Sequence, residues 1–218
     1  VLCVLIIMAG FKEIITAEFS DTSGIVMFLV FIFIFVLVTL PVFKYGKYNA
    51  VDISITLYGV FYVIFLFMFL VLTRSLEHGS YYIWLILIGA WSTDTFAYAG
   101  GSLFGKQKKN KLAPNLSPNK TVEGFVSGII GSILMLSIYG IYLQSNLNPI
   151  PFYHYIIIGL LCGIISQVGD LVASSTKRYT KVKDFGRIIP GHGGVLDRFD
   201  SVLLTAPVVY FYLTFFII

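Results

Sequence analysis

Runs of apolar residues long enough to cross a membrane recur along the 218-residue chain, and they limit its fold more than any other feature. Residues 25–40, for example, are almost entirely Val, Ile, Leu and Phe. A helix of about 20 apolar residues crosses about 30 Å of bilayer hydrocarbon. The composition, 57% hydrophobic with a mean hydropathy of +0.88, is also far from that of a soluble domain. The sequence therefore predicts an all-α, polytopic integral membrane protein.

We expect about seven transmembrane helices in a single membrane domain. The predicted spans are residues 1–17, 23–43, 51–73, 80–99, 122–143, 152–176 and 201–218. Polar chemistry is sparse before residue 74, so we divide the domain into N-terminal spans (1–73), a catalytic region (74–205) and the last span (201–218). The chain opens Val-Leu-Cys without Met and inside an apolar run, which leads us to expect a fragment that lacks N-terminal spans.

Positive charge falls on every second connection between the predicted spans. The connections at 44–50, 100–121 and 177–200 hold 13 of the 15 basic residues. Cytoplasmic loops of membrane proteins carry such an excess of Lys and Arg. We therefore predict that these three segments face the cytoplasm.

Four carboxylates lie near the cytoplasmic border of this arrangement. Asp94 and Asp170 each lie just inside the end of an apolar span, where a carboxylate is costly and suggests function. The alternative for Asp94 is a helix–helix hydrogen bond with neighbouring Ser and Thr residues. Asp197 and Asp200, three residues apart, share one face of a helix expected to open near 197.

The same border carries the chemistry of a phosphate site with a metal ion. Lys and Arg side chains and glycine backbone amides bind phosphates, and carboxylate oxygens hold hard divalent cations. His192 alone does not favour zinc, because no Cys or second His is near it in the sequence.

The basic segment 100–121 ends in a helix start. Gly100–Lys106 fits the G-x-x-x-x-G-K pattern, but Gln107 follows where a phosphate-binding loop needs Ser or Thr, and a membrane helix precedes it. Ser117 or Thr121 can cap a helix that starts near 121, with Glu123 in its first turn. That helix start, with Lys120, also forms a candidate anion site. Its lysines alone are equally consistent with a topology signal or an anionic-lipid patch.

These residues resemble the signature of the phosphatidate cytidylyltransferase (CDP-diacylglycerol synthase) family. Thr176 departs from the family pattern, which usually has an aliphatic residue there. The similarity covers roughly residues 75–205. The matching signature positions are Ser174, Lys177, Arg178, Lys183, Asp184, Gly186, Pro190, His192, Gly193, Gly194, Asp197, Arg198 and Asp200, and upstream Asp94, Ser117, Lys120, Thr121, Glu123 and Gln167-x-Gly169-Asp170.

The resemblance implies a reaction in which CTP and phosphatidate give CDP-diacylglycerol and pyrophosphate. It implies that Mg²⁺ is held by Asp170 and Asp197, with room for a second cation. The implied catalytic residues are Asp170, Lys177, Arg178, Lys183, Asp184, His192, Asp197, Arg198 and Asp200. The implied substrate-binding residues are Asp94, Ser117, Lys120, Thr121, Glu123, Ser174, Gly193 and Gly194. It further implies a homodimer among membrane lipids, in the inner membrane if the source is bacterial. From the distribution of basic residues we expect the active site on the cytoplasmic side, and we expect no nucleic-acid partner.

Two alternatives remain open from the sequence. A CTP-dependent polyprenol or phytol kinase would use the same nucleotide but would transfer its γ-phosphate to an alcohol. CDP-archaeol synthesis is a variant of the cytidylyltransferase reaction with a different lipid substrate. An ion-coupled transporter or channel would use Asp94, Asp170 and Asp197 as an ion path. A transporter should have polar residues through the depth of several helices, whereas here they gather at one border.

Overall fold

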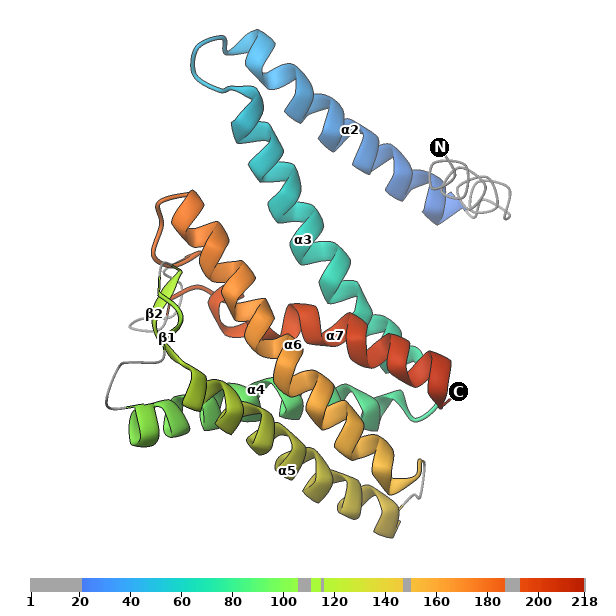
Figure 1. Ribbon diagram of the computed structural model, residues 1–218. Coiled ribbons are helices and arrows are strands. Elements are labelled where there is room, and N and C mark those ends of the chain that lie inside the picture. The colour runs from blue at the N-terminus through green and yellow to red at the C-terminus, as the bar shows by residue number, and fades with distance from the viewer. Residues whose placement is uncertain (1–20, 106–110, 115, 147–149, 187–192, 218) are drawn as a thin grey trace, which may run out of the picture. The chain divides into compact units, whose positions relative to one another are not determined.

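The computed structural model describes residues 21–105, 111–114, 116–146, 150–186 and 193–217. This part of the chain is mainly helical (Figure 1). The helices are α2 (Asp21–Phe43), α3 (Ala50–Ser75), α4 (Gly79–Phe104), α5 (Val122–Asn146), α6 (Phe152–Tyr179) and α7 (Leu196–Phe216), and the strands are β1 (Lys111–Ala113) and β2 (Ser117–Thr121).

The prediction of a helical membrane protein is confirmed. Four of the described helices, α3, α5, α6 and α7, are long and apolar enough to cross a membrane. Helices α2 and α4 cover two further predicted spans. The predicted span 1–17 lies outside the described residues, so the count of seven stays a prediction.

The segment 100–121, which we predicted as a loop, contains regular structure instead. Helix α4 runs on to Phe104, and β1 and β2 then form an antiparallel hairpin with Lys111 opposite Thr121 and Ala113 opposite Ser117. A turn that includes Pro114 joins the two strands, since proline fits a turn better than a helix interior. The hairpin delivers the chain directly to the start of α5, where the sequence predicts a helix.

The described chain divides into two compact units, residues 1–60 and 61–218. The first unit contains α2 and the start of α3, joined by a short connection. Asn49 caps α3, because its Oδ1 accepts hydrogen bonds from the backbone N–H groups of Val51 and Asp52 at 2.8 and 3.0 Å. This unit carries none of the predicted site residues.

The second unit is a helical bundle in which α4, α5, α6 and α7 pack on one another (Figure 1). Its core consists of fully buried side chains such as Leu85, Leu136, Tyr155, Ile158 and Val202. In a bilayer these side chains leave lipid rather than water, so van der Waals packing and interhelical hydrogen bonds hold the bundle together.

Glycines let the helices of this bundle approach closely. A Cβ on Gly163 of α6 would lie 2.7 Å from the Cα of Ile129 in α5, and one on Gly124 of α5 would lie 2.8 Å from the carbonyl oxygen of Ala97 in α4. A Cβ on Gly128 would likewise lie 3.0 Å from the carbonyl oxygen of Thr93, so Gly124 and Gly128 permit close helix packing, as their spacing predicts.

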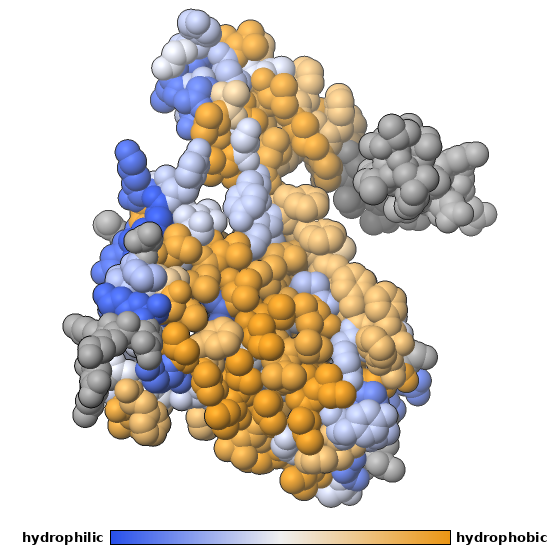
Figure 2. Space-filling view, viewed as in Figure 1, coloured by the Kyte–Doolittle hydropathy of each residue, from blue (hydrophilic) through white to orange (hydrophobic). Residues whose placement is uncertain are grey.

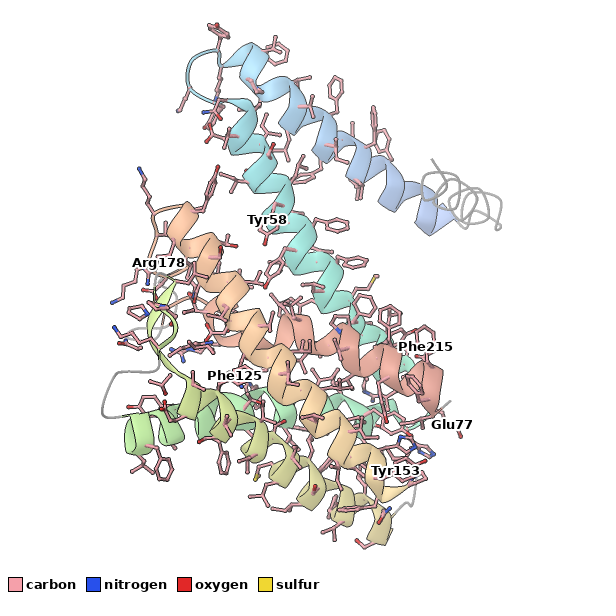
Figure 3. All side chains as sticks on the ribbon, viewed as in Figure 1. Tyr58, Glu77, Phe125, Tyr153, Arg178 and Phe215 are labelled. Carbon is pink, nitrogen blue, oxygen red and sulfur yellow. The ribbon has the colours of Figure 1, made fainter. Side chains whose placement is uncertain are left out.

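The surface of the second unit separates apolar and polar regions. In Figure 2, hydrophobic residues cover most of its visible face, while hydrophilic residues gather at the edge where Figure 1 places β1 and β2. The alternating helix directions bring the start of α5, the end of α6 and the start of α7 to this edge. Figure 3 shows Arg178 at this end of α6 and Tyr153 at the opposite end.

Candidate active site

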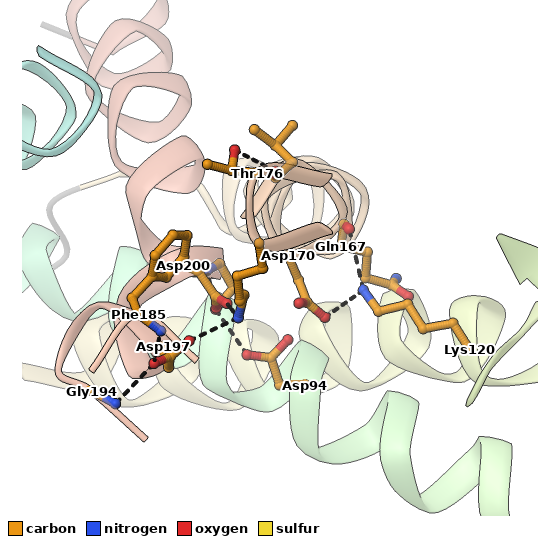
Figure 4. Close-up of polar contacts among 12 residues, drawn as sticks. Asp94, Lys120, Gln167, Asp170, Thr176, Phe185, Gly194, Asp197 and Asp200 are labelled. Carbon is orange, nitrogen blue, oxygen red and sulfur yellow. Dashed lines mark hydrogen bonds and ion pairs between the residues drawn. The ribbon is translucent and has the colours of Figure 1, made fainter. Parts of the chain in front are cut away.

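The C-terminal half of α6 provides the backbone of the site. Asp170 and Lys177 are seven residues apart, two helical turns, so they project from one face of the helix. Each meets a residue of opposite charge from another part of the chain (Figure 4). The face of α6 that carries them is therefore the meeting point of the hairpin, the α6–α7 connection and α7.

Lys120 of β2 forms an ion pair with Asp170. Its Nζ lies 2.5 Å from Oδ2 of Asp170 and 3.4 Å from the carbonyl oxygen of Gln167. Arg178 adds a second link, because its Nε donates to the carbonyl oxygen of Leu116 at 3.3 Å. Two basic residues predicted to bind phosphate thus also connect the hairpin to α6.

Lys177 lies between two carboxylates of α7. Its Nζ is 2.8 Å from Oδ1 of Asp197 and 3.6 Å from Oδ2 of Asp200, and its side chain is only 14% exposed. The same ammonium lies 5.1 Å from the ring centroid of Phe185, a cation–π distance. A buried ammonium is stable only with such partners.

The second oxygen of Asp197 binds the backbone of the α6–α7 connection. Oδ2 accepts hydrogen bonds from the N–H groups of Phe185 at 2.9 Å and Gly194 at 2.8 Å. Asp197 lies in the first turn of α7, where the helix dipole also favours a carboxylate.

Three further carboxylates, on three helices, face one another. Asp94 of α4, Asp170 of α6 and Asp200 of α7 are close enough to repel one another electrostatically. The hydroxyl of Ser201 donates to Oδ2 of Asp94 at 2.8 Å, and the fully buried Ser166 lies beside it. Asp94 therefore makes the helix–helix hydrogen bond of the alternative interpretation, with Ser201 of α7 as the donor, and its role in the site stays a prediction.

A cavity of about 430 Å³ opens between α4, the hairpin, α5 and α6. This volume falls within the range of small-molecule sites, roughly 300–1,000 Å³. Its wall includes Asp94, Asn119, Lys120, Gln167 and Asp170. A pocket with so many polar groups suits a polar ligand.

Thr121, at the rim of the same cavity, caps α5. Its Oγ1 accepts from the N–H of Gly124 at 3.1 Å, and Glu123 lies in the first turn of the helix. The predicted helix cap and the predicted acidic residue in the first turn are both confirmed, and the cap is Thr121 rather than Ser117.

A second hollow, of about 370 Å³, lies on the α7 side of Asp94. It is lined by Trp91 and Thr95 of α4 and by Asp197, Arg198, Phe199 and Asp200 of α7. The rings of Trp91 and Phe199 lie 6.5 Å apart, and Trp91 is 45% exposed. Asp94 borders both spaces, so the carboxylates stand between the polar cavity and a hollow that combines two aromatic rings with charged side chains.

The structure brings together much of the predicted set but not all of it. Ser117 pairs with Ala113 inside the hairpin, and Lys183 and Asp184 are exposed in the α6–α7 connection. Ser174 is half-buried on α6, and Gly193 and Gly194 lie against Asp197. His192 lies outside the described residues. The residues that converge around the carboxylates are Asp94, Lys120, Thr121, Asp170, Lys177, Asp197, Arg198 and Asp200.

Sequence reasoning gave no site role to Trp91, Asn119, Gln167 or Ser201. Gln167 donates to the carbonyl oxygens of Phe125 and Gly163 at 3.0 and 2.8 Å, which fixes α5 against α6 beside the cavity. Gln167 lies three residues before Asp170, and residues at this spacing share a helix face. That spacing could have predicted that Gln167 lies beside the cavity. Asn119 and Ser201 each adjoin a predicted site residue in sequence, but Trp91 carries no such signal.

The carboxylates are of the ligand type that binds divalent cations, but they are not arranged as a metal site. Among the residues that the structure describes, no three Asp, Glu, His or Cys side chains converge tightly enough to hold a metal ion as they stand. Yet Asp94, Asp170 and Asp200 offer hard oxygen ligands of like charge, whose repulsion a cation would relieve. Asp197 can join them only through Oδ1, the oxygen bound by Lys177.

The fold and the site define a polytopic helical membrane protein with acidic and basic side chains gathered at one end of its bundle. Its sequence matches the model of the cytidylyltransferase family over residues 1–216. The phosphatidate cytidylyltransferase of Bacillus subtilis is 37% identical over 201 residues, which are 91% of this chain and 72% of that protein. The phosphatidate cytidylyltransferase of Staphylococcus saprophyticus is 42% identical over 175 residues, covering 80% of this chain. The present chain spans 64% of that second relative's length. The chain therefore belongs to the cytidylyltransferase family, a family of nucleotidyltransferases.

Proposed function

We propose that this protein transfers CMP from CTP to phosphatidate, giving CDP-diacylglycerol and pyrophosphate. Its relatives in Bacillus and Staphylococcus are phosphatidate cytidylyltransferases. The observation that carries the proposal is the convergence of Lys120, Lys177 and Arg198 with the carboxylates at the end of the bundle. Anionic substrates from water and from the lipid surface would meet at such a place.

In the proposed reaction, a phosphate oxygen of phosphatidate attacks the α-phosphorus of CTP. The bond from that phosphorus to the bridging oxygen of the β-phosphate breaks, and pyrophosphate leaves. Enzymes accelerate such steps mainly by positioning the reactants and neutralising charge. The ammonium of Lys177 and the guanidinium of Arg198 are suited to neutralise charge on the phosphates. Lys120, on the wall of the polar cavity, is suited to the triphosphate.

The two spaces beside Asp94 suit the two substrates. The polar cavity offers the amide of Asn119, the side-chain oxygen of Gln167 and the ammonium of Lys120 to the nucleotide. The space between α4 and α7 offers the rings of Trp91 and Phe199 to a lipid, with Arg198 for its phosphate. Attack would then take place at the carboxylates that separate the two spaces.

A divalent cation, Mg²⁺ by our proposal, belongs to this reaction. When bound, it would neutralise phosphate charge and orient the leaving pyrophosphate. Asp170 and Asp197 are the ligands that the sequence predicts, and Asp94 and Asp200 are the carboxylates that the structure adds beside Asp170. The assignment predicts that chelation with EDTA abolishes CMP transfer and that Mg²⁺ restores it.

The orientation and assembly are also proposals. The excess of Lys and Arg in the segments around the site supports a cytoplasmic active site. The resemblance to the phosphatidate cytidylyltransferase family supports a homodimer in the membrane.

The decisive experiment follows a label on the α-phosphate of CTP. Purified protein in detergent is supplied with phosphatidate, Mg²⁺ and the labelled nucleotide. We expect the label in a chloroform-soluble product and stoichiometric release of pyrophosphate. If an alcohol such as a polyprenol is phosphorylated while the label stays in CDP, the kinase replaces this proposal.

A further inference from the structure

Asp197 and Asp200 are three residues apart on α7, but their carboxylates have different surroundings. Asp200 faces the carboxylates of Asp94 and Asp170, and its Oδ1 accepts from the neighbouring N–H of Ser201 at 2.9 Å. Asp197 faces the α6–α7 connection, and its side chain is 8% exposed. The two acids therefore serve different parts of the structure, although Lys177 lies between them.

Asp197 contacts three separate parts of the chain at once. Its Oδ1 accepts from Lys177 at the end of α6, and its Oδ2 accepts from the N–H of Phe185 and the N–H of Gly194. A carboxylate has about four acceptor sites, so three of the four are in use. Phe185 and Gly194 flank residues 187–192, which lie outside the described part of the chain.

The two flanks also touch each other beside Asp197. A Cβ on Gly194 would lie 2.8 Å from the backbone nitrogen of Gly186, and one on Gly193 would lie 3.0 Å from Oδ2 of Asp197. Gly193 has a φ of +82°, a conformation that glycine adopts readily and other residues do not. The Gly-Gly pair therefore brings the returning chain close enough for one carboxylate to bind both flanks.

We infer that Asp197 is a positioning residue that, in the ligand-free protein, clamps Phe185 and Gly194 to the end of α6 and orients Lys177. The clamp ties Phe185, Gly194 and Lys177 to a single carboxylate on α7. The clamp itself is a property of the ligand-free protein, and only its effect on turnover rests on the proposed function.

Two substitutions of Asp197 test the clamp in the metal-free protein. In Asp197→Asn, the remaining side-chain oxygen can still accept from Phe185 and Gly194, while the new NH₂ group faces Lys177 and breaks that pair. Asp197→Ala loses all three contacts.

The measurement is hydrogen–deuterium exchange of peptides that cover Phe185 and Gly194, in protein free of metal and nucleotide. We expect exchange at these amides to accelerate by about tenfold or more in Asp197→Ala, since hydrogen bonds to a charged acceptor are among the stronger ones. Asp197→Asn should show a smaller increase, and Asp200→Asn, the matched control three residues on, should show none at these two amides. Unchanged exchange in Asp197→Ala, or equal acceleration in the Asn and Ala variants, overturns the clamp.

Gly194→Ala tests the same contact without removing a carboxylate. Its Cβ should force the flanks apart and speed exchange at Phe185, and unchanged exchange there also counts against the clamp. This variant keeps the test decisive if Asp197→Ala does not fold. In the CMP-transfer assay, we expect the wild-type protein to be the most active, Asp197→Asn to be less active and Asp197→Ala to be the least active. If the unmodified protein transfers no CMP, the proposed function fails while the exchange result still decides the clamp.

Discussion

The ammonium of Lys120 lies 2.5 Å from Oδ2 of Asp170, which joins the second strand of the hairpin to the C-terminal half of α6. The carboxylate of Asp170 also repels the carboxylates of Asp94 and Asp200 electrostatically. Lys120 therefore reduces repulsion in the carboxylate group while it forms part of the wall of the polar cavity. Removal of the Lys120 side chain should therefore affect the binding of CTP and the binding of the divalent cation differently.

Lys120→Ala should weaken the use of CTP without weakening the binding of the divalent cation. We expect kcat/KM for CTP to fall by about tenfold or more, because a charge-assisted contact to phosphate contributes about 1.5–3 kcal/mol. The Mg²⁺ concentration for half-maximal activity should stay equal or fall, since Asp170 loses its competing cation. Steady-state kinetics at varied CTP and Mg²⁺ measure both, with exposed Lys111→Ala on β1 as the control. A higher Mg²⁺ requirement would contradict this account of the pair.

Asp200→Asn should nearly abolish turnover while the protein still folds. The substitution removes one of three mutually repelling carboxylates, and a metal ion contributes several kcal/mol to charge stabilisation, so we expect a loss of about a hundredfold or more in kcat. The side-chain oxygen of asparagine can still accept from the N–H of Ser201. CMP transfer and gel filtration in detergent provide the two readouts. Glu77→Gln, an exposed acid at the other end of the bundle, should retain full activity, and near-normal turnover in Asp200→Asn would remove Asp200 from the site.

Trp91→Ala should raise the KM for phosphatidate more than the KM for CTP. Trp91 lines the space between α4 and α7 with Phe199, and loss of a large aromatic contact weakens apolar binding. Trp84 is the matched control: it lies on the same helix two turns earlier and is 47% exposed, against 45% for Trp91. Mixed-micelle kinetics at varied surface concentration of phosphatidate make the comparison. Equal effects of the two substitutions would show that the lipid does not use this space.

Gly163→Ala should destabilise the bundle, whereas Gly59→Ala should not. A Cβ at Gly163 would lie 2.7 Å from the Cα of Ile129, and the backbone must shift to admit it, at about 1–3 kcal/mol. A Cβ at Gly59 meets nothing within 4 Å, and alanine in a helix is more stable than glycine by about 0.5–1 kcal/mol. Thermal unfolding in a single detergent measures both. A Gly163→Ala protein as stable as the unmodified one would show that α5 and α6 can separate at little cost.

Helix positions in this protein were predictable because hydrophobic length alone specifies them. The expected spans 51–73 and 152–176 correspond to α3 at Ala50–Ser75 and α6 at Phe152–Tyr179. The hairpin was missed because its strands are short, polar and interrupted by proline. Its stability comes from contacts distant in sequence, such as Lys120 with Asp170 and Arg178 with Leu116. No local pattern carries that information.

For the site, the residue types were predictable and their partners were not. Acids and bases at one border indicated a phosphate site, and the structure gathers most of them. The separate surroundings of Asp197 and Asp200 depend on which way the α6–α7 connection folds back, which a spacing of three cannot specify. Trp91 and Phe199 lie in different helices, so only packing reveals that they line one space.

Helix α6 carries Gly163, Gln167, Asp170 and Lys177 along its length. The first two contact α5, Asp170 contacts the hairpin and Lys177 contacts α7. Each residue added to a helix rotates the remainder of that helix by about 100° and advances it by about 1.5 Å. A single insertion between Gly163 and Asp170 would leave the bundle packed on one side and turn both charged residues away from their partners. Evolution can therefore vary the side chains on the lipid-facing side of α6 freely, but insertions and deletions within this stretch should be absent from active descendants.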